Sequence, residues 1–430
     1  MKSTQSKAVS RRAPRPVRVP PPLTRGDEKF EGSSVLTEFE GDFGILLWQS
    51  LRNVLLWSAT DPARRKGLFS SGAEERRRVK LLSADMDDAL RAPLAVLARL
   101  LADPAGADRR RVSSSCLKIA DWAEKKEALA TALAFTQAAA LSGSNDARIS
   151  YAVGRIARQR AEYPRAETWF RRAILLGRQG GDWESYAMAF GGLGNLYMQR
   201  GSLPAAQKAL LRSYRAAKRK GLRNVQGMAL HDLFVIALKR LQFREAEELA
   251  GAALKAYGPG HPRLPALGHD VTVFWINQGC YAPALTVLTA LRPHLQGPVD
   301  QALVLAHMAE AAAGIGDRKT YEESWKASSE LIAGAGSVRS AGVYLALADS
   351  AAMMHDWELA AGVAKQAIML ADAREEVEIK EEAEARLAEV QHGQSVLTAG
   401  KEAAEPWIVG HADGLADSFA KSLQVSVAAR

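Results

Sequence analysis

The chain has 430 residues, of which 47% are hydrophobic and 24% are charged, and its formal net charge is +9. This composition is typical of a globular protein with a large core, built as two or three domains or as one elongated array. The positive charge is concentrated in residues 1–26, which hold seven basic residues and no acid, whereas the other residues are nearly neutral, with fifty basic against 48 acidic residues. The charge therefore does not predict a nucleic-acid-binding body.

Two cysteines, Cys116 and Cys280, lie far apart in the chain. Their number excludes a disulfide framework and a cysteine zinc site, and it favours a reducing compartment. The first residues lack the apolar core of a secretory signal. The most apolar stretch, residues 43–57, is too short to span a membrane and is interrupted by polar residues. We therefore expect a cytoplasmic protein with no membrane contact.

Composition divides the chain into segments. Residues 1–30 are rich in Pro and Arg and are expected to be a disordered tail, with at most weak electrostatic contact to nucleic acid. Residues 31–106 have the apolar spacing of about three helices, and we expect them to cap the N-terminal end of the fold. A repeat region is predicted over 107–391, closed by a helix over 375–390. Residues 392–430 form a C-terminal extension with a short helix around 410–423.

The repeat region shows the same pattern of small and large residues several times. Gly154 and Gly194 are forty positions apart, as are Ala206 and Ala246. Corresponding residues recur every 37–40 positions or so, which is longer than the ~34 of the commonest helical-hairpin repeat. The aligned positions of the units are Gly154, Ala166, Phe170 and Ala173; Gly194, Tyr197, Gly201, Ala206 and Leu210; Ala237, Leu241, Ala246, Ala250 and Ala253; Trp275, Gly279, Ala284 and Leu288; Ala309, Ala312, Gly316, Tyr321 and Trp325; Ala348, Ala351, Ala360, Ala364 and Ala367; and, in a degenerate first unit, Cys116, Ile119, Ala128 and Ala132.

This pattern resembles the tetratricopeptide repeat (TPR), in the long form seen in the TPR regions of bacterial regulators such as the maltose-regulator type and peptide-sensing regulators. The resemblance implies an all-α fold: an α-solenoid, a right-handed superhelix of helical hairpins. Small residues let the two helices of a hairpin approach closely, and large residues fill the space between hairpins. One hairpin cannot bury its own apolar face, so stacking and terminal caps are required.

No motif of an enzyme is present: the chain lacks the patterns of phosphate loops, serine nucleophile elbows and zinc proteases. The His-Asp neighbours at 231–232 and 269–270 point about 100° apart on a helix and are not ready dyads. We expect no catalytic residue, no metal site and no cofactor, so the chain is interpreted as a non-enzyme.

The resemblance implies that the first helix of each unit lines a concave groove. Its ligand-facing positions carry over to Arg148, Tyr151, Arg155, Arg158, Asn195, Gln199, His231, Lys239, His269 and Asn277, with Leu238 and Ile276 as apolar contacts. In some family members Asn grips a peptide backbone and Arg or Lys a carboxylate. Val235 stands where a full carboxylate clamp needs a polar residue. A solvated helix face with no ligand, or salt bridges between repeats, remains the simpler explanation of these charges.

Two functions stay open. The first is a non-enzymatic scaffold or adaptor that binds a peptide or partner helix in the groove. The alternative is a signal-sensing regulator of a bacterial transcription pathway that binds a ligand or peptide there. The partner is a protein or peptide in the first case, and self-association as a homo-oligomer is a further prediction.

Overall fold

We describe the fold from a computed structural model of the chain. The described residues are 32–143, 145–334, 340–374, 376–392 and 406–428. Within these ranges every regular element is a helix, which confirms the all-α prediction. No helix among them combines the length and the apolarity that crossing a bilayer requires. The predicted disordered tail, residues 1–30, lies outside the described residues.

Packing divides the chain into two compact units, Met1–Val225 and Gln226–Arg430, which we call the N-terminal and C-terminal units. The N-terminal unit contains α1 (Ser34–Glu38), α2 (Gly41–Ala59), η1 (Pro62–Arg64), α3 (Ala73–Ser83), α4 (Asp88–Ala102), α5 (Arg109–Lys125), α6 (Leu129–Gly143), α7 (Ala147–Gln159), α8 (Tyr163–Gly180), α9 (Trp183–Gln199), α10 (Leu203–Lys220) and the start of α11 (Arg223–Lys239). The predicted boundaries at 106 and 391 remain predictions.

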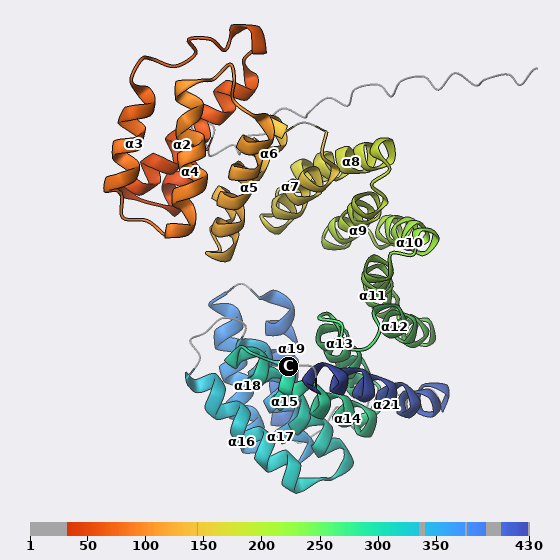
Figure 1. The fold of residues 1–430 in the computed structure, drawn as a ribbon. Coiled ribbons are helices and arrows are strands. Elements are labelled where there is room, and N and C mark those ends of the chain that lie inside the picture. Colours follow the sequence, from red (N-terminus) through yellow and green to blue (C-terminus); the bar gives the residue numbers. More distant parts are fainter. Residues whose placement is uncertain (1–31, 144, 335–339, 375, 393–405, 429–430) are drawn as a thin grey trace, which may run out of the picture. The chain divides into compact units, whose positions relative to one another are not determined.

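The C-terminal unit contains the rest of α11 and the helices that follow it (Figure 1). These are α12 (Phe243–Tyr257), α13 (Leu264–Asn277), α14 (Tyr281–Leu291), η2 (Arg292–His294), α15 (Pro298–Ile315), α16 (Arg318–Gly334), α17 (Ser340–Met353), α18 (Trp357–Asp372), α19 (Val377–Gln391) and α21 (Pro406–Ala428). The sequence predicts a helix over 375–390, where α19 lies. The short helix expected around 410–423 is part of the longer α21, which packs against α12, α13 and α14.

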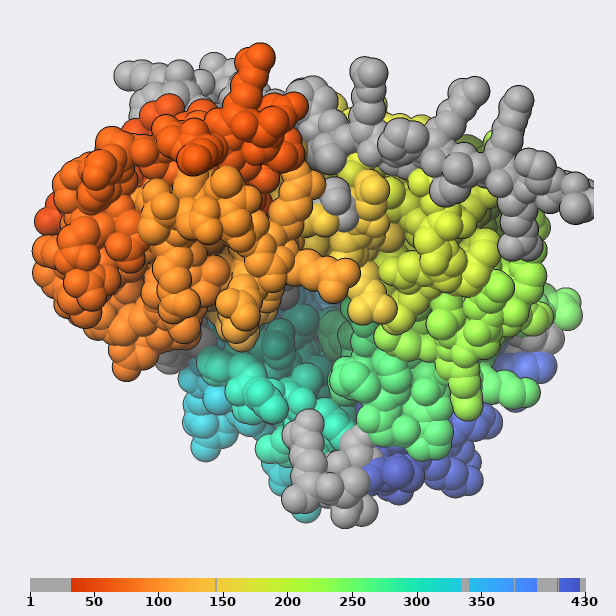
Figure 2. All heavy atoms as spheres, turned by 45° about the horizontal axis from the view of Figure 1, so that its top comes forward, coloured from red at the N-terminus to blue at the C-terminus, as the bar shows by residue number. Residues whose placement is uncertain are grey.

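Within each unit the helices form pairs that stack on their neighbours, from α5 to α10 in the N-terminal unit and from α12 to α18 in the C-terminal unit, which makes the fold an α-solenoid. We call α5, α7, α9, α11, α13, α15 and α17 the first helices and their partners α6, α8, α10, α12, α14, α16 and α18 the second helices. In the N-terminal unit the stacked pairs follow one another as adjacent bands from orange to yellow-green in Figure 2. Each hairpin thus buries its apolar face against the next one along the chain.

Two glycines show why the repeat needs small residues in the first helix. A Cβ on Gly154 would lie 2.7 Å from the Phe170 ring, and a Cβ on Gly194 would lie 2.5 Å from Leu210. Both distances are far below ordinary van der Waals contact, so only glycine permits these close approaches. The predicted role of the small residues in packing the hairpins is confirmed at both positions.

The turn between the two helices of each hairpin contains one residue with a left-handed backbone. The turn residues are Glu127, Ala161, Gly201, Leu241, Gly279, Gly316 and His355, with φ between 56° and 76°. Their spacing matches the sequence repeat, although only three of them are glycine. Because a residue with a Cβ pays a steric penalty at positive φ, the stacked helices must hold the other four turns in this conformation.

Helices α1, α2 and α4 pack on the first hairpin of the N-terminal unit, and α3 packs on α4. The sequence predicts about three helices here; α2, α3 and α4 are these helices, while α1 and η1 are too short to be read from periodicity. The Glu38 carboxylate of α1 accepts hydrogen bonds of 2.7 Å from the backbone N–H groups of Ala130 and Thr131, at the start of α6. The indole of the buried Trp57 donates to the carbonyl of Pro104 at 2.7 Å.

Candidate partner-binding face

The three arginines predicted to bind a partner lie on α7 in the N-terminal unit. Asp146 caps this helix by accepting hydrogen bonds from the N–H groups of Arg148 and Ile149. Arg148 and Arg155 fall on one side of α7, because a step of seven residues brings helical positions back to nearly the same direction, and Arg158 lies one turn after Arg155 on the adjoining side. The Arg148 side chain is 77% exposed, and its Nε lies 3.6 Å from Asp182. This side of α7 therefore presents positive charge.

Arg155 is already held by an acidic residue of the preceding hairpin. Its guanidinium makes a two-pronged hydrogen bond to both carboxylate oxygens of Glu124 on α5, one of them at 2.7 Å. The side chains are 32% and 29% exposed. The bond to Glu124 raises the pKa of the Arg155 guanidinium, although burial acts in the opposite direction. A partner carboxylate would have to replace Glu124 to bind Arg155 in the same manner.

The neighbouring predicted residues differ in how far they can reach a partner. Tyr151 packs its ring against Phe170, with the ring centroids 5.9 Å apart. On α9, the Asn195 Oδ1 atom is shielded from solvent and makes no hydrogen bond within the described residues. Gln199 is exposed at the last position of α9. Of this group, Gln199 is therefore the most accessible polar contact.

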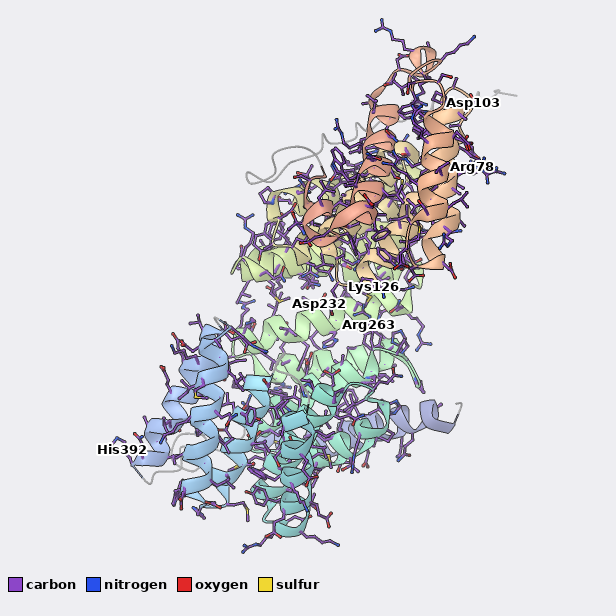
Figure 3. All side chains as sticks on the ribbon, turned by 90° about the vertical axis from the view of Figure 1, so that its left-hand side faces the viewer. Arg78, Asp103, Lys126, Asp232, Arg263 and His392 are labelled. Carbon is purple, nitrogen blue, oxygen red and sulfur yellow. The ribbon has the colours of Figure 1, made fainter. Side chains whose placement is uncertain are left out.

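In the C-terminal unit His231 binds a carboxylate on the next first helix. Its Nε2 lies 2.8 Å from Oδ2 of Asp270, so α11 is tied to α13. Asp232 follows His231 on α11 and is labelled in Figure 3, but the carboxylate that His231 contacts is that of Asp270. Burial raises the pKa of Asp270, but hydrogen bonds from His231 and His269, together with their charge, lower it to about 2.

His269, on the same helix as Asp270, extends these polar contacts from α13 to α15. Its Nε2 lies 3.1 Å from Nδ1 of His307 on α15, so one imidazole must donate and the other accept. Burial and the neighbouring His269 lower the pKa of His307 to about 3. His307 is therefore neutral at pH 7.

Further along the same unit, charged residues join α17 to α19. Arg386 of α19 donates to Asp349 of α17 and, at 2.6 Å, to Glu389. The side chains of Arg386 and Asp349 are only 17% and 16% exposed. The first helices of this unit are thus joined by polar side-chain contacts from α11 to α15, and α17 is joined to α19 in the same way.

The remaining predicted positions are divided between surface and core. Lys239 and Asn277 are exposed at the last positions of α11 and α13. Leu238 is half-buried, but Ile276 is only 2% exposed. The prediction that Ile276 contacts a partner is therefore wrong, because α13 turns this side chain into the core.

Sequence reasoning missed the residues that face the predicted ones across a hairpin boundary: Glu124, Asp270 and His307. The repeat contains a usable signal for two of them. Asp270 follows His231 by 39 residues and His307 follows His269 by 38, so each pair occupies nearly the same repeat position on successive first helices. Such positions lie side by side in a stack of hairpins. Within the described ranges no group of three or more His, Cys, Asp or Glu side chains is placed to hold a metal ion.

Comparisons with known proteins find solved structures of low similarity to this chain. No family model matches the sequence, and no curated protein matches it. Aspartyl phosphate phosphatase F from Bacillus subtilis is 10% identical, with 81% of this chain and 93% of that chain covered and a TM-score of 0.41. BtubC (BKLC) from P. vanneervenii is 14% identical, with 64% and 92% covered and a TM-score of 0.31.

A signal transduction ATPase (STAND) with a tetratricopeptide repeat sensor from Pyrococcus horikoshii is also similar. It is 12% identical, with 84% of this chain and 54% of that chain covered, and the TM-score is 0.40. Since all three TM-scores lie below 0.5, none carries a functional inference for this chain. Its own stacked hairpins, with glycine at the close helix contacts and left-handed hairpin turns, make it a TPR-like helical-repeat protein.

Proposed function

We propose that the chain is a non-enzymatic scaffold that binds a protein or peptide partner on its first helices, in the cytoplasm. The observation that supports this most is the row of arginines on α7, with Arg148 highly exposed and Arg155 already in carboxylate-binding geometry. Guanidinium groups bind carboxylates through two parallel hydrogen bonds, which fixes orientation as well as affinity. The partner segment proposed for this face therefore carries acidic residues or a free carboxyl terminus.

The contact between Arg155 and Glu124 supports a specific mode of binding. Glu124 holds the Arg155 side chain in one conformation and shields part of its charge. A partner carboxylate competes with Glu124 for the same guanidinium, so removing the charge of Glu124 favours the partner. Arg148 and Arg158 supply the charge that attracts the segment, and the exposed Gln199 offers a hydrogen bond at the neighbouring helix.

Charge variants with opposite expected effects test this function. The full chain is tagged, expressed in its native cells and recovered with its bound proteins, which are quantified by mass spectrometry. Arg148→Glu combined with Arg158→Glu should lower capture of the partner at least tenfold, on the scale of one or two charged hydrogen bonds. Glu124→Gln should increase capture of the same protein.

The matched control places the same charge change on a second helix. Arg215 and Arg219 are exposed on α10, and Arg215→Glu combined with Arg219→Glu should leave capture unchanged. The proposal fails if both double variants behave alike, or if no captured protein responds to either variant of the first helices.

One observation favours the alternative, a signal-sensing regulator of a bacterial transcription pathway. Polar contacts join α11, α13 and α15 through His231, Asp270, His269 and His307, and a bound ligand that replaced one of them would alter helix packing. The recovery experiment distinguishes the two functions. A scaffold yields a protein that depends on the arginines, whereas a sensor yields a small molecule or short peptide in the mass spectrum of the purified chain.

A further inference from the structure

A hollow lies on the second-helix side of the N-terminal unit, between α8 and α10, with α9 as its floor. It has a volume of about 540 Å³. Phe190 and Leu193 of α9 line the floor, and Leu175 of α8 is 51% exposed at its edge. None of the residues predicted to bind a partner on α7 or α9 lines it. We call this hollow the α8–α10 groove.

The rim of the α8–α10 groove is basic. Arg171 stands on the α8 side, and Lys208 and Arg212 stand on the α10 side. Arg171 donates to Glu167 at 2.7 Å and to the Tyr197 hydroxyl at 3.2 Å, which fixes its position at the rim. The Arg212 guanidinium lies over the Phe190 ring, 5.6 Å from its centroid. Lys208 and Arg212 are both exposed.

In the C-terminal unit, the corresponding groove holds a helix. Helix α21 packs against α12, α13 and α14, and it buries the stripe Ile408, Ala412, Ala416, Phe419 and Leu423. Leu415 lies beside Gly251 of α12, at the distance of ordinary contact with a Cβ placed there. The Gly260 N–H donates to the carbonyl of Ser422 at 3.0 Å. A groove of this kind therefore accepts an amphipathic helix.

The sequence repeat relates the walls of the two grooves. On the second helices Ala166 of α8 corresponds to Ala246 of α12, so Arg171 corresponds to Gly251. Ala206 of α10 corresponds to Ala284 of α14, so Lys208 corresponds to Thr286 and Arg212 to Ala290. The N-terminal groove thus has basic residues at three wall positions where the C-terminal groove has small or neutral ones.

We propose that the α8–α10 groove binds an acidic amphipathic helix of a partner protein, in the pose that α21 adopts in its own groove. The partner helix carries an apolar stripe like that of α21. Where α21 places Leu415 beside Gly251, the partner helix has an acidic residue that faces Arg171, and further acids face Lys208 and Arg212. The basic rim disfavours α21 of a second copy, because its Leu415 would meet the Arg171 guanidinium instead of a glycine.

Synthetic peptides with the α21 sequence test the proposal on the full chain. One peptide has the native sequence of residues 406–428, and the other differs by Leu415→Glu alone. The Glu peptide should bind more tightly than the native one, by at least fivefold, and its affinity should fall as salt is raised. Lys208→Glu combined with Arg212→Glu in the chain should weaken binding of the Glu peptide at least tenfold.

Two control variants show whether an effect on peptide binding is specific to the α8–α10 groove. Arg215→Glu combined with Arg219→Glu places the same charge change elsewhere on α10 and should alter affinity less than twofold. The α7 double variant, Arg148→Glu with Arg158→Glu, should also have no effect, so this test is independent of the proposed first-helix function. The proposal is overturned if the Glu peptide does not bind, or if its binding survives reversal of Lys208 and Arg212. Equal or tighter binding of the native peptide would instead assign the groove to a second copy of the chain.

Discussion

Glu247 is a carboxylic acid whose surroundings oppose its charge. It lies on α12, is 3% exposed, and neither carboxylate oxygen makes a hydrogen bond of ordinary geometry within the described residues. Burial raises the pKa of Glu247 to about 7, although the charge of His411 and the indole of Trp275 act in the opposite direction. Burial, aided by the charges of Glu247 and Asp413, also raises the pKa of the Cys280 thiol to about 11. The residues around the α21 docking site therefore favour neutral forms.

This pKa shift predicts a pH dependence with a definite sign. The folded chain binds the Glu247 proton more tightly than the unfolded chain, so the contribution to stability is present below about pH 4.5 and is lost as pH rises toward 7. Glu247→Gln should raise the free energy of unfolding at pH 8 by about 2–3 kcal/mol and leave it nearly unchanged at pH 4.5. Urea unfolding followed by circular dichroism at the two pH values measures the difference.

The adjacent residue provides the control for Glu247. Glu248 is largely exposed on the same helix and makes an exposed salt bridge to Arg244, so Glu248→Gln should change stability by less than about 0.5 kcal/mol at either pH. A Glu247→Gln protein that is less stable than the native chain at pH 8 would show that the carboxylate is stabilised in a way that its burial does not account for.

At the scale of helices, periodicity and small residues predicted the hairpins well. The turns were harder to predict: three of the seven left-handed turn residues are glycine, whereas Leu241 and His355 hold the same conformation with a full side chain. Partner residues across hairpins were also missed. Glu124 is 31 residues from Arg155, so nothing in the local pattern of α7 indicates that its arginine is paired. Packing between hairpins decides such contacts, and a single helix does not encode it.

Two glycines of α9, three residues apart, allow the effect of helix packing on stability to be distinguished from that of helix propensity. A Cβ on Gly191 would meet only Ser213 at 3.6 Å, whereas one on Gly194 would meet Leu210 at 2.5 Å. Gly191→Ala should therefore stabilise the chain by about 0.5–1 kcal/mol, because alanine favours the helix. Gly194→Ala gains the same amount but forces α9 and α10 apart, and it should destabilise the chain by about 1–2 kcal/mol overall.

Denaturant midpoints of the two variants, measured side by side, test this account of the repeat. Equal stabilisation by both substitutions would mean that the close approach at Gly194 is not required for the hairpin.

At the scale of the whole chain, the property that matters for partner binding is that stacked repeats contact mainly their neighbours. Among the described residues of each unit, the hairpins contact chiefly their neighbours along the chain, so the surface available for partners is large relative to the core. The net charge of +9 proved uninformative about this surface, since its excess lies in residues outside the described ranges. Local clusters matter instead: arginines on the first helix α7, and a basic groove between the second helices α8 and α10.

The central claim is that partner binding occurs on the first helices, and photo-crosslinking in native cells tests it most directly. A photoreactive amino acid replaces the exposed Gln199 of α9 in one protein and the exposed Lys365 of α18, which lies in neither proposed binding site, in another. After irradiation, position 199 should give a discrete adduct with a protein, and this adduct should disappear when Arg148 and Arg158 are changed to Glu. Position 365 should give none. Adducts of equal yield at both positions, or an adduct at 199 that persists without the arginines, would contradict the account.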